Sequence, residues 1–249
     1  MRCIDLNCDL GEGAGHDAEL MLLITSANIA CGGHAGTGDT MRAAVELALR
    51  HGVAIGAHPG LEDRPNFGRK ELSVTPDEAR ALVRRQFEAL DRIARSCGAR
   101  IGHVKLHGAL YNISSRDAAV AKALASAVRE ADPQLVLFGL AGGELLSAGR
   151  ACGLRVASEV FADRNYEPDG SLTPRSRPEA TISDGTVAAT RALRMIREGV
   201  VVAADGTRVA IAADTICVHG DGPHAVDFAW RLRQELTAGA ILVRALHPG

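Results

Sequence analysis

Apolar residues recur with two different spacings along the chain. In the longer segments they return every third or fourth residue, which places them on one face of a helix. Between these segments lie short runs rich in apolar and β-branched residues, which are typical of strands. The clearest helix is predicted to begin after Thr75, because Thr75 and Glu78 form a capping box with Pro76 at the first helical position. Another helix is predicted to begin after Ser115 and to end before Pro133.

Strands and helices alternate over most of the sequence. Seven strands are predicted, at residues 3–9, 27–31, 53–58, 103–107, 135–140, 155–160 and 215–219. Several helical segments end at a glycine, as at Gly52, Gly98 and Gly153, which suits a left-handed helix end. Strict alternation predicts an α/β fold with a mainly parallel sheet and helices outside it. An open, doubly wound sheet and a closed barrel both fit this order.

The polar residues inside the predicted strands favour the barrel. Asp5, Asn7 and Asp9 alternate with apolar residues in the first strand, and Lys105 lies in a similar alternation at 103–107. A strand covered by helices on both faces would be apolar throughout. The polar face is therefore predicted to line the interior of a single irregular (β/α) barrel. A length of 249 residues suits one such domain spanning 1–249.

Two stretches depart from the alternation. Asp205-Gly206 lies between two β-like runs, which predicts a hairpin insertion near 200–211. Residues 162–181 contain three prolines and predict a long loop. A connection of that length is usually functional or mobile.

Side chains that can act as acids, bases or metal ligands gather where the predicted strands end. They are Asp9, Glu12, His34, His58, His107, Glu159 and His219. In parallel α/β barrels this rim is where sites are built. Each histidine also has a structural interpretation as a hydrogen-bonded residue, and Lys105 is either part of a buried ion pair or a cation that stabilises a negative oxygen. Histidines and carboxylates from separate strands suit zinc or another divalent ion, so the sequence leaves a metal open.

Three further motifs carry less information. Glycines 36 and 38 open a helix whose N–H groups suit an anion, but the Gly-Lys-Ser/Thr ending of a Walker P-loop is missing. Residues 141–144 form a similar helix-opening turn. Cys31 precedes His34 by three residues, and we interpret it as a buried cysteine rather than a nucleophile.

Composition excludes several classes of function. A formal net charge of -2 and an aromatic content of 3% argue against nucleic acid as a partner. The sequence has no apolar run long enough to span a membrane and no signal peptide, which predicts a cytoplasmic protein without a membrane partner. Its six cysteines contain no Cys-x-x-Cys pair, so a zinc finger or disulfide framework is not expected.

A set of short motifs covers essentially the whole chain. They read DLNCDLGEG from residue 5, ANIACGGHAG from 27, GAHPG from 56, NFGR from 66, VKLHGALYN from 104, EVFADRNY from 159 and VHGD from 218. In these motifs the sequence resembles the LamB/YcsF family, to which the A subunits of 5-oxoprolinase belong. The resemblance implies an incomplete barrel of about seven strands, similar to polysaccharide deacetylases.

The resemblance also implies a function. That function is the ATP-dependent opening of the lactam 5-oxoproline (pyroglutamate) to L-glutamate, with ATP as cofactor and subunits B and C as partners. Under this hypothesis Lys105, with Arg164 or Arg69, stabilises charge. The predicted catalytic set is Asp9, Glu12, His58, Lys105 and His107, and the predicted substrate-binding set is Asp5, Asn7, Asn28, His34, Glu159, Arg164 and His219.

Three alternatives remain open from the sequence. In the first, the chain is a stand-alone, metal-dependent amide or ester hydrolase. In the second, it is a non-catalytic subunit that binds the lactam and passes it on. In the third, it is a nucleotide-binding module. The missing Walker ending argues most strongly against the last of these.

Overall fold

The fold is built around a barrel of parallel strands. The computed structural model describes residues 2–218 and 225–247. Its barrel strands are β1 (Cys3–Leu10), β2 (Ser26–Ala30), β3 (Ala54–His58), β4 (His103–Lys105), β5 (Val136–Leu140), β6 (Arg155–Phe161) and β9 (Thr215–Val218). Every neighbouring pair is parallel, and β1 pairs with both β2 and β9. The predicted seven-strand barrel is therefore confirmed, and the incomplete barrel implied by the resemblance is corrected, because the β1–β9 pairing closes the ring.

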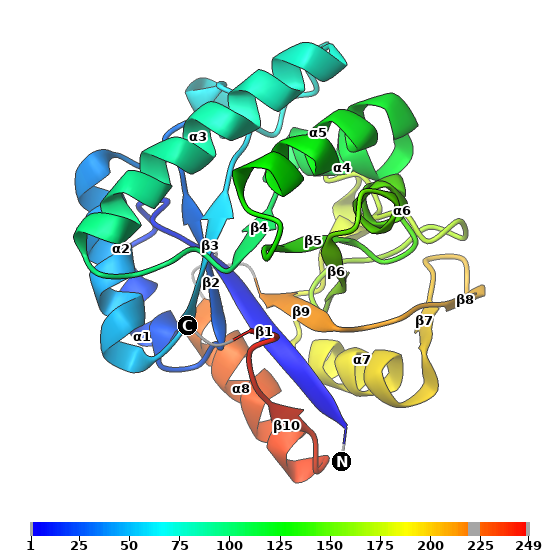
Figure 1. The fold of residues 1–249 in the computed structure, drawn as a ribbon. Coiled ribbons are helices and arrows are strands. Elements are labelled where there is room, and N and C mark those ends of the chain that lie inside the picture. Colours follow the sequence, from blue (N-terminus) through cyan, green and yellow to red (C-terminus); the bar gives the residue numbers. More distant parts are fainter. Residues whose placement is uncertain (1, 219–224, 248–249) are drawn as a thin grey trace.

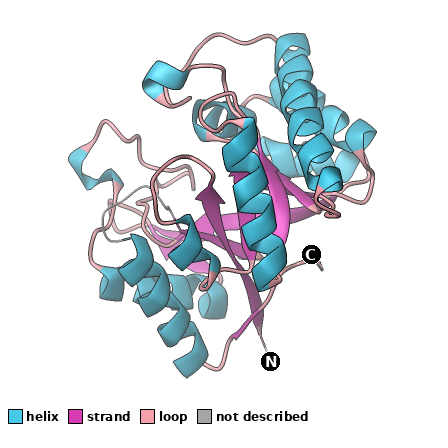
Figure 2. Cartoon of the chain, turned by 90° about the vertical axis from the view of Figure 1, so that its left-hand side faces the viewer, coloured by secondary structure: helices cyan, strands magenta, loops and turns pink. Residues whose placement is uncertain are grey.

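Helices surround the barrel (Figures 1 and 2). They are α1 (Asp17–Met21), α2 (Gly38–His51), α3 (Pro76–Ser96), α4 (Gly108–Arg116), α5 (Ala118–Ala131), α6 (Glu144–Ala151), α7 (Gly185–Glu198) and α8 (Ala225–Ala238). Helix α3 packs beside α5, and α7 packs beside α8. Their apolar faces and the outward faces of the strands form one core, which includes Leu6, Leu90 and Leu124.

The helix ends follow local sequence signals. Thr75 accepts a hydrogen bond from the Glu78 backbone N–H, and the Glu78 side chain accepts one from the Thr75 N–H, so the predicted capping box begins α3. Gly52 ends α2 in the left-handed conformation. The start predicted after Ser115 is wrong. Ser115 lies inside α4, and the Asp117 carboxylate caps α5 instead, because it accepts from the backbone N–H groups of Ala119 and Val120 in the first turn of that helix.

The two irregular stretches are both ordered by backbone pairing. Strands β7 (Val200–Val202) and β8 (Arg208–Ala210) form the antiparallel hairpin expected at 200–211. Within the loop at 162–181, isolated bridges join Arg164 to Thr181 and Tyr166 to Leu172. Short 3-10 turns at Arg64–Asn66 and Pro178–Ala180, and strand β10 (Leu242–Val243) beside the start of β1, complete the described elements.

The inside of the barrel is polar and densely packed. Asp5, Asn7, Asn28, His103 and Thr215 are all fully buried there. We expected the polar strand faces to line an interior cavity, but over most of the barrel these side chains fill the space by bonding to one another. The C-terminal ends of several strands border an open cavity, so a ligand can reach the barrel at this rim.

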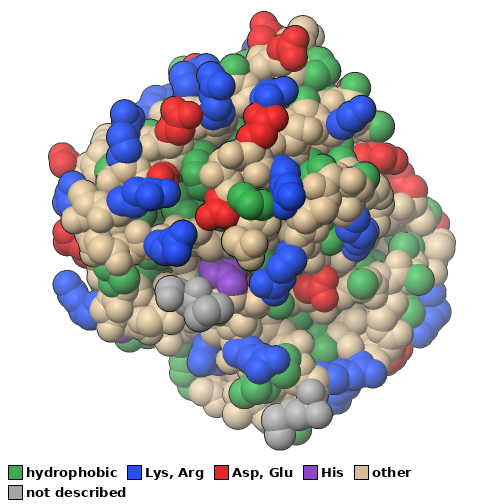
Figure 3. Space-filling view, viewed as in Figure 1, with side chains coloured by type: hydrophobic (Ala, Val, Ile, Leu, Met, Phe, Trp, Pro, Cys, Tyr) green, Lys and Arg blue, Asp and Glu red, His purple; other side chains and the backbone are tan. Residues whose placement is uncertain are grey.

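The surface shows mixed charge. Figure 3 shows, on the face seen in Figure 1, positive and negative side chains interspersed and hydrophobic groups scattered among them. Among the described helices, none is long and apolar enough to cross a membrane.

Candidate functional site

Lys105, the last residue of β4, lies inside the barrel at the base of the cavity described below. Its Nζ is 2.9 Å from Asp9 Oδ1 and 2.9 Å from Glu159 Oε1, and it donates to Asn7 Oδ1 at 3.1 Å. Burial alone lowers the pKa of the ammonium, but the charges of neighbours that include Asp9 and Glu159 outweigh burial and raise this pKa well above its usual value. Lys105 is therefore a permanently charged cation at the base of the rim.

A polar layer below Lys105 holds it in place. Asn7 donates to Glu159 Oε1 at 3.0 Å and to Thr215 at 2.7 Å. Asn28 donates to Asn7 at 2.7 Å and to Asp9 at 2.8 Å. Parallel register makes these contacts possible, because it places Asn28 beside Asp9 and Thr215 beside Glu159 on adjoining strands.

Asp5 lies deepest in this layer. It accepts from Thr25, Ser26 and Thr215, and burial raises its pKa against the effect of these hydrogen bonds. Asp5, Asn7 and Asn28 are not among the residues that line the cavity described below. Their contacts support a positioning role, and the direct substrate contact predicted for them stays a prediction.

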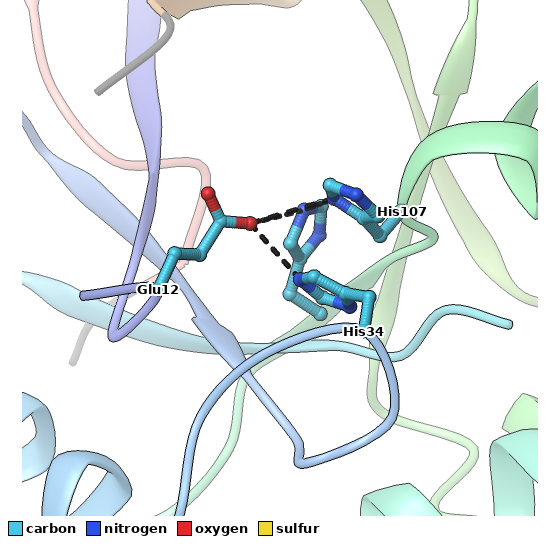
Figure 4. Close-up of side chains that lie close together, drawn as sticks. Glu12, His34 and His107 are labelled. Atoms are coloured by element: carbon cyan, nitrogen blue, oxygen red, sulfur yellow. Dashed lines mark hydrogen bonds and ion pairs between the residues drawn. The ribbon is translucent and has the colours of Figure 1, made fainter. Parts of the chain in front are cut away.

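Four side chains converge where the first four strands end. Glu12 follows β1, His34 follows β2, His58 ends β3, and His107 follows β4. Glu12 Oε1 lies 3.0 Å from His34 Nε2 and 3.4 Å from His107 Nδ1, and Figure 4 shows Glu12 pointing at both rings. His58 Nε2 lies 2.9 Å from His107 Nδ1. We call these four residues the Glu–His cluster.

Burial holds two of these rings in the neutral state. The pKa of His34 falls to about 3, mainly because burial disfavours the imidazolium and secondly because of His58. Burial, followed by His58 and His34, lowers the pKa of His107 well below its usual value. Neutral imidazoles have a lone pair available for a cation or a proton.

The loop after β3 presses against the cluster. His107 Nε2 lies 2.9 Å from the Phe67 carbonyl oxygen, and His34 stacks on His107 with ring centroids 3.6 Å apart. Gly68 has φ +61°, and a Cβ there would lie 2.7 Å from His34 Cβ. Only glycine lets this loop approach the rings so closely.

A cavity of about 370 Å³ opens above Lys105 and the cluster. This volume lies within the range of roughly 300–1,000 Å³ that is usual for small-molecule sites. Asp9, Glu12, His58, Lys105 and His107, the whole predicted catalytic set, lie on its wall. His34 packs behind the wall. Glu159 is also absent from the lining residues, although its Oε1 contacts Lys105.

Arginines surround the mouth of the cavity. Arg69, Arg164 and Arg175 line it, on the loop after β3 and the loop at 162–181. Arg164 donates to the carbonyl oxygens of Ala180 and Thr173, which ties this loop together. Burial and the charge of Arg175 lower the Arg164 pKa to about 10, so Arg164 remains charged at neutral pH.

Sequence reasoning missed several residues of the wall, and three of them carry polar groups that matter for the chemistry. Tyr111 and Asn112 come from the first turns of α4, and Arg175 comes from the long loop. Burial, followed by the Glu159 carboxylate, raises the Tyr111 pKa well above its usual value, so the phenol keeps its proton. Their position one helical turn beyond the rim residue His107 is the signal that was available for Tyr111 and Asn112.

The remaining sequence predictions have separate outcomes. Cys31 is buried, and burial raises its pKa to about 12, which agrees with a buried thiol rather than a nucleophile. Thr37 caps α2 directly after Gly36, and α6 begins at Glu144, as predicted for the two glycine turns. His219 lies outside the described residues.

The comparisons with known proteins agree with this architecture. The model of the LamB/YcsF family matches residues 4–248. The chain belongs to the LamB/YcsF family. It is 54% identical to the A subunit of 5-oxoprolinase from Geobacillus kaustophilus (strain HTA426), with 98% of this chain and 97% of that relative covered.

Solved structures extend the LamB/YcsF comparison to the fold. The lactam utilization protein from Thermus thermophilus is 45% identical, with a TM-score of 0.91 over 99% of this chain and 100% of that one. The T48 deacetylase with substrate is only 14% identical, with a TM-score of 0.51 over 97% of this chain and 87% of that one. The deacetylase shares the fold alone, which bears out the expected similarity to that class.

Proposed function

We propose that this LamB/YcsF chain is the lactam-handling subunit of an ATP-dependent 5-oxoprolinase, a hydrolase of several subunits. The buried Lys105 ammonium at the base of an arginine-rimmed cavity carries the proposal, because it provides a fixed positive charge where a lactam oxygen becomes negative. Relatives about half identical over nearly their whole length are named as the A subunit of 5-oxoprolinase, which supports this substrate and a complex of several subunits. We expect the partners to be subunits B and C, as the family resemblance implies.

The chemistry of the substrate explains the need for ATP. A five-membered lactam is an unstrained amide, and its carbonyl carbon is a poor electrophile. Transfer of the γ-phosphoryl group of ATP to the lactam oxygen releases ADP and gives an imidate phosphate. Water then adds to that carbon, the carbon–nitrogen bond breaks as the nitrogen takes a proton, and a second water releases phosphate from the acyl phosphate to leave L-glutamate.

The wall of the cavity provides groups for these steps. Lys105, with Arg69 or Arg164 at the mouth, stabilises charge on the oxygen and the phosphoryl group. Asp9 or Glu12, together with His58 or His107, serves as the base for water and the acid for the ring nitrogen. We assign the substrate carboxylate to the arginine mouth, because guanidinium groups pair well with carboxylates.

ATP is assigned to the complex rather than to a nucleotide site on this chain. The sequence has no Walker P-loop, and its helix-opening glycine turns at 36–39 and 141–144 lack a lysine in the Walker position. Which subunit transfers the phosphoryl group is decided by assaying the three subunits separately and in combination.

The test is ATP-coupled glutamate formation by the reconstituted three-subunit complex. We expect Lys105→Ala, His107→Ala and Asp9→Asn each to lower kcat/KM by at least about 100-fold, the lower range for removing a charge-stabilising or acid–base group. Lys122→Ala, at an exposed lysine of α5, is the matched control and should retain the wild-type rate. Thermal unfolding of each variant separates lost chemistry from lost folding.

The outcomes distinguish this function from the alternatives. Wild-type rates for all three site variants would contradict the assignment of the catalytic site. Lactam hydrolysis by the isolated chain without ATP would instead identify a stand-alone hydrolase. Weakened lactam binding in the variants, with unchanged turnover of bound lactam, would identify a subunit that only binds and delivers substrate.

A further inference from the structure

We propose that Glu12, His34, His58 and His107 bind a divalent first-row transition-metal ion, with zinc as the first ion to test. The four ligand atoms, Glu12 Oε1, His34 Nε2, His58 Nε2 and His107 Nδ1, all lie within 4.8 Å of one another. Ligand atoms about 2.0–2.1 Å from a tetrahedral zinc lie about 3.3 Å apart. The separations of 2.9, 3.0, 3.4 and 3.8 Å within the cluster bracket that value.

In His58 and His107, the ring nitrogen that points away from the cluster contacts a backbone carbonyl oxygen, which determines where the ring carries its proton. His58 Nδ1 lies 2.9 Å from the Lys105 carbonyl oxygen, and His107 Nε2 lies 2.9 Å from the Phe67 carbonyl oxygen. A carbonyl oxygen can only accept, so each of these nitrogens must donate its N–H. A neutral imidazole has one N–H, which leaves His58 Nε2 and His107 Nδ1 with lone pairs.

These two lone pairs face each other at only 2.9 Å. With both rings neutral, neither nitrogen donates to the other, and the Glu12 carboxylate oxygen lies 3.8 and 3.4 Å from them. Asp9 Oδ2 adds a further acceptor 3.3 Å from His58 Nε2. The centre of the cluster therefore gathers electron pairs from two rings and two carboxylates in a buried place, which a bound metal ion or an added proton would stabilise.

The surroundings match those of a metal site. A metal-bound histidine usually donates its second N–H to a carbonyl or carboxylate, as His58 and His107 do here. Gly68 packs the loop after β3 against His34 and so restricts its position. Glu12, His58 and His107 border the cavity, so a bound ion would face it. With the ion bound, these three residues would serve as ligands, and Asp9 on the same wall would remain as the acid–base group of the proposed function.

The donor set selects the class of ion. Three imidazole nitrogens and one carboxylate oxygen suit zinc and its first-row neighbours, whereas magnesium and calcium prefer oxygen ligands. A shared proton between His58 and His107 is the competing explanation of the short contact. It predicts a cluster that is indifferent to both zinc and chelators.

The experiment uses the whole isolated chain without a histidine tag, first stripped with a chelator and then titrated with zinc chloride by calorimetry. We expect one zinc per chain, no comparable binding of magnesium, and a higher unfolding temperature with zinc that the chelator reverses. His58→Ala and Glu12→Gln should each weaken zinc binding by at least about 100-fold, the upper range for loss of a supporting residue. His51→Ala, at an exposed histidine ending α2, should bind like the wild type.

Anomalous scattering from zinc-soaked wild-type crystals keeps the test decisive if a variant fails to fold. A single strong peak among the four ligand atoms supports the proposal. A peak elsewhere, the absence of stoichiometric binding, or wild-type affinity in both site variants overturns it. No lactam, ATP or partner subunit is present in this assay, so its failure is distinct from failure of the proposed 5-oxoprolinase function.

Discussion

At the scale of single residues, the barrel interior depends on charge balance. Lys105 contacts the carboxylates of Asp9 and Glu159 at 2.9 Å, and its side chain is almost completely buried. Removing one partner of a buried ion pair leaves the other charge without compensation, which costs more than the intact pair contributes. The contacts that hold Lys105 in place therefore make the barrel interior vulnerable to single substitutions.

Lys105→Met is expected to lower the free energy of unfolding by about 3–5 kcal/mol, because it leaves the Asp9 and Glu159 carboxylates facing each other without the cation. The double variant Lys105→Met/Glu159→Gln should recover part of that loss. Urea unfolding followed by circular dichroism measures both. A double variant no more stable than Lys105→Met would contradict this account of the interior.

His103 gives the fold a dependence on pH. Burial, followed by the charges of His247 and Lys105, lowers the His103 pKa well below 6.5. The unfolded chain takes up a proton as pH falls below about 6.5, whereas folded His103 does not until a lower pH. Stability should therefore be full above pH 6.5 and fall below it, by about 1.4 kcal/mol per pH unit for each such histidine. Buried His34 and His107 act in the same direction.

The His103→Gln variant should show a shallower loss of stability between pH 6.5 and 5, by about one proton per chain. Urea unfolding at a series of pH values, with chelator present throughout, measures the slope. His16→Gln, at a histidine outside the barrel, is the control and should keep the wild-type slope. An unchanged slope in His103→Gln would contradict the prediction.

At the scale of elements, the helix ends and loops are set by local chemistry. The capping box of α3 satisfies backbone N–H groups that have no partner inside the helix. Thr75→Ala is expected to cost about 1 kcal/mol of unfolding free energy. Thr190→Ala, at an exposed threonine inside α7, should change stability by less than about 0.5 kcal/mol. Equal effects of the two substitutions in urea unfolding would rule out the cap as the cause.

The loop after β3 is a second element with a specific requirement. Gly68 and Gly153 both have positive φ, but a Cβ at Gly68 would lie 2.7 Å from His34 Cβ, whereas a Cβ at Gly153 would meet nothing within 4 Å. Gly153→Ala should cost about 1 kcal/mol through backbone strain alone. Gly68→Ala should cost more and also lower the activity of the complex, because it displaces His34. Similar stability and activity in the two variants would contradict this role of the loop.

At the scale of the whole molecule, closure of the barrel brings distant residues together. Glu159 and Asn7 are 152 positions apart and form a hydrogen bond inside the ring. The cavity combines the rim of the strands with two long loops, and three of its lining residues are arginines. In the proposed function, this cavity holds the small anionic lactam.

The isolated chain is expected to bind 5-oxoproline but to release neither glutamate from it nor phosphate from ATP, since ATP consumption is assigned to the complex. Calorimetry measures the binding, and a phosphate-release assay measures the turnover with and without the partner subunits. Arg69→Ala should weaken binding, and Arg42→Ala, at an exposed arginine of α2, should not. ATP hydrolysis by the chain alone would contradict this division of labour.

Much of the fold is predictable because its signals are local. The two spacings of apolar residues mark strands and helices, the box at Thr75 starts α3, and alternation of Asp5, Asn7 and Asp9 indicates a polar barrel interior. The sequence places the start of α5 after Ser115, whereas the helix begins after Asp117. Several residues in this stretch are able to cap a helix, and packing selects Asp117.

The sequence by itself determined the α/β class, the parallel strands and the rim on which the candidate residues lie. Only the tertiary structure decided that β1 meets β9, that Asp5, Asn7 and Asn28 are packed beneath the cavity, and that Glu12, His34, His58 and His107 converge. The reason is physical. Periodicity and caps depend on neighbours along the chain, whereas closure and convergence depend on strand register and on the paths of loops that no local pattern records.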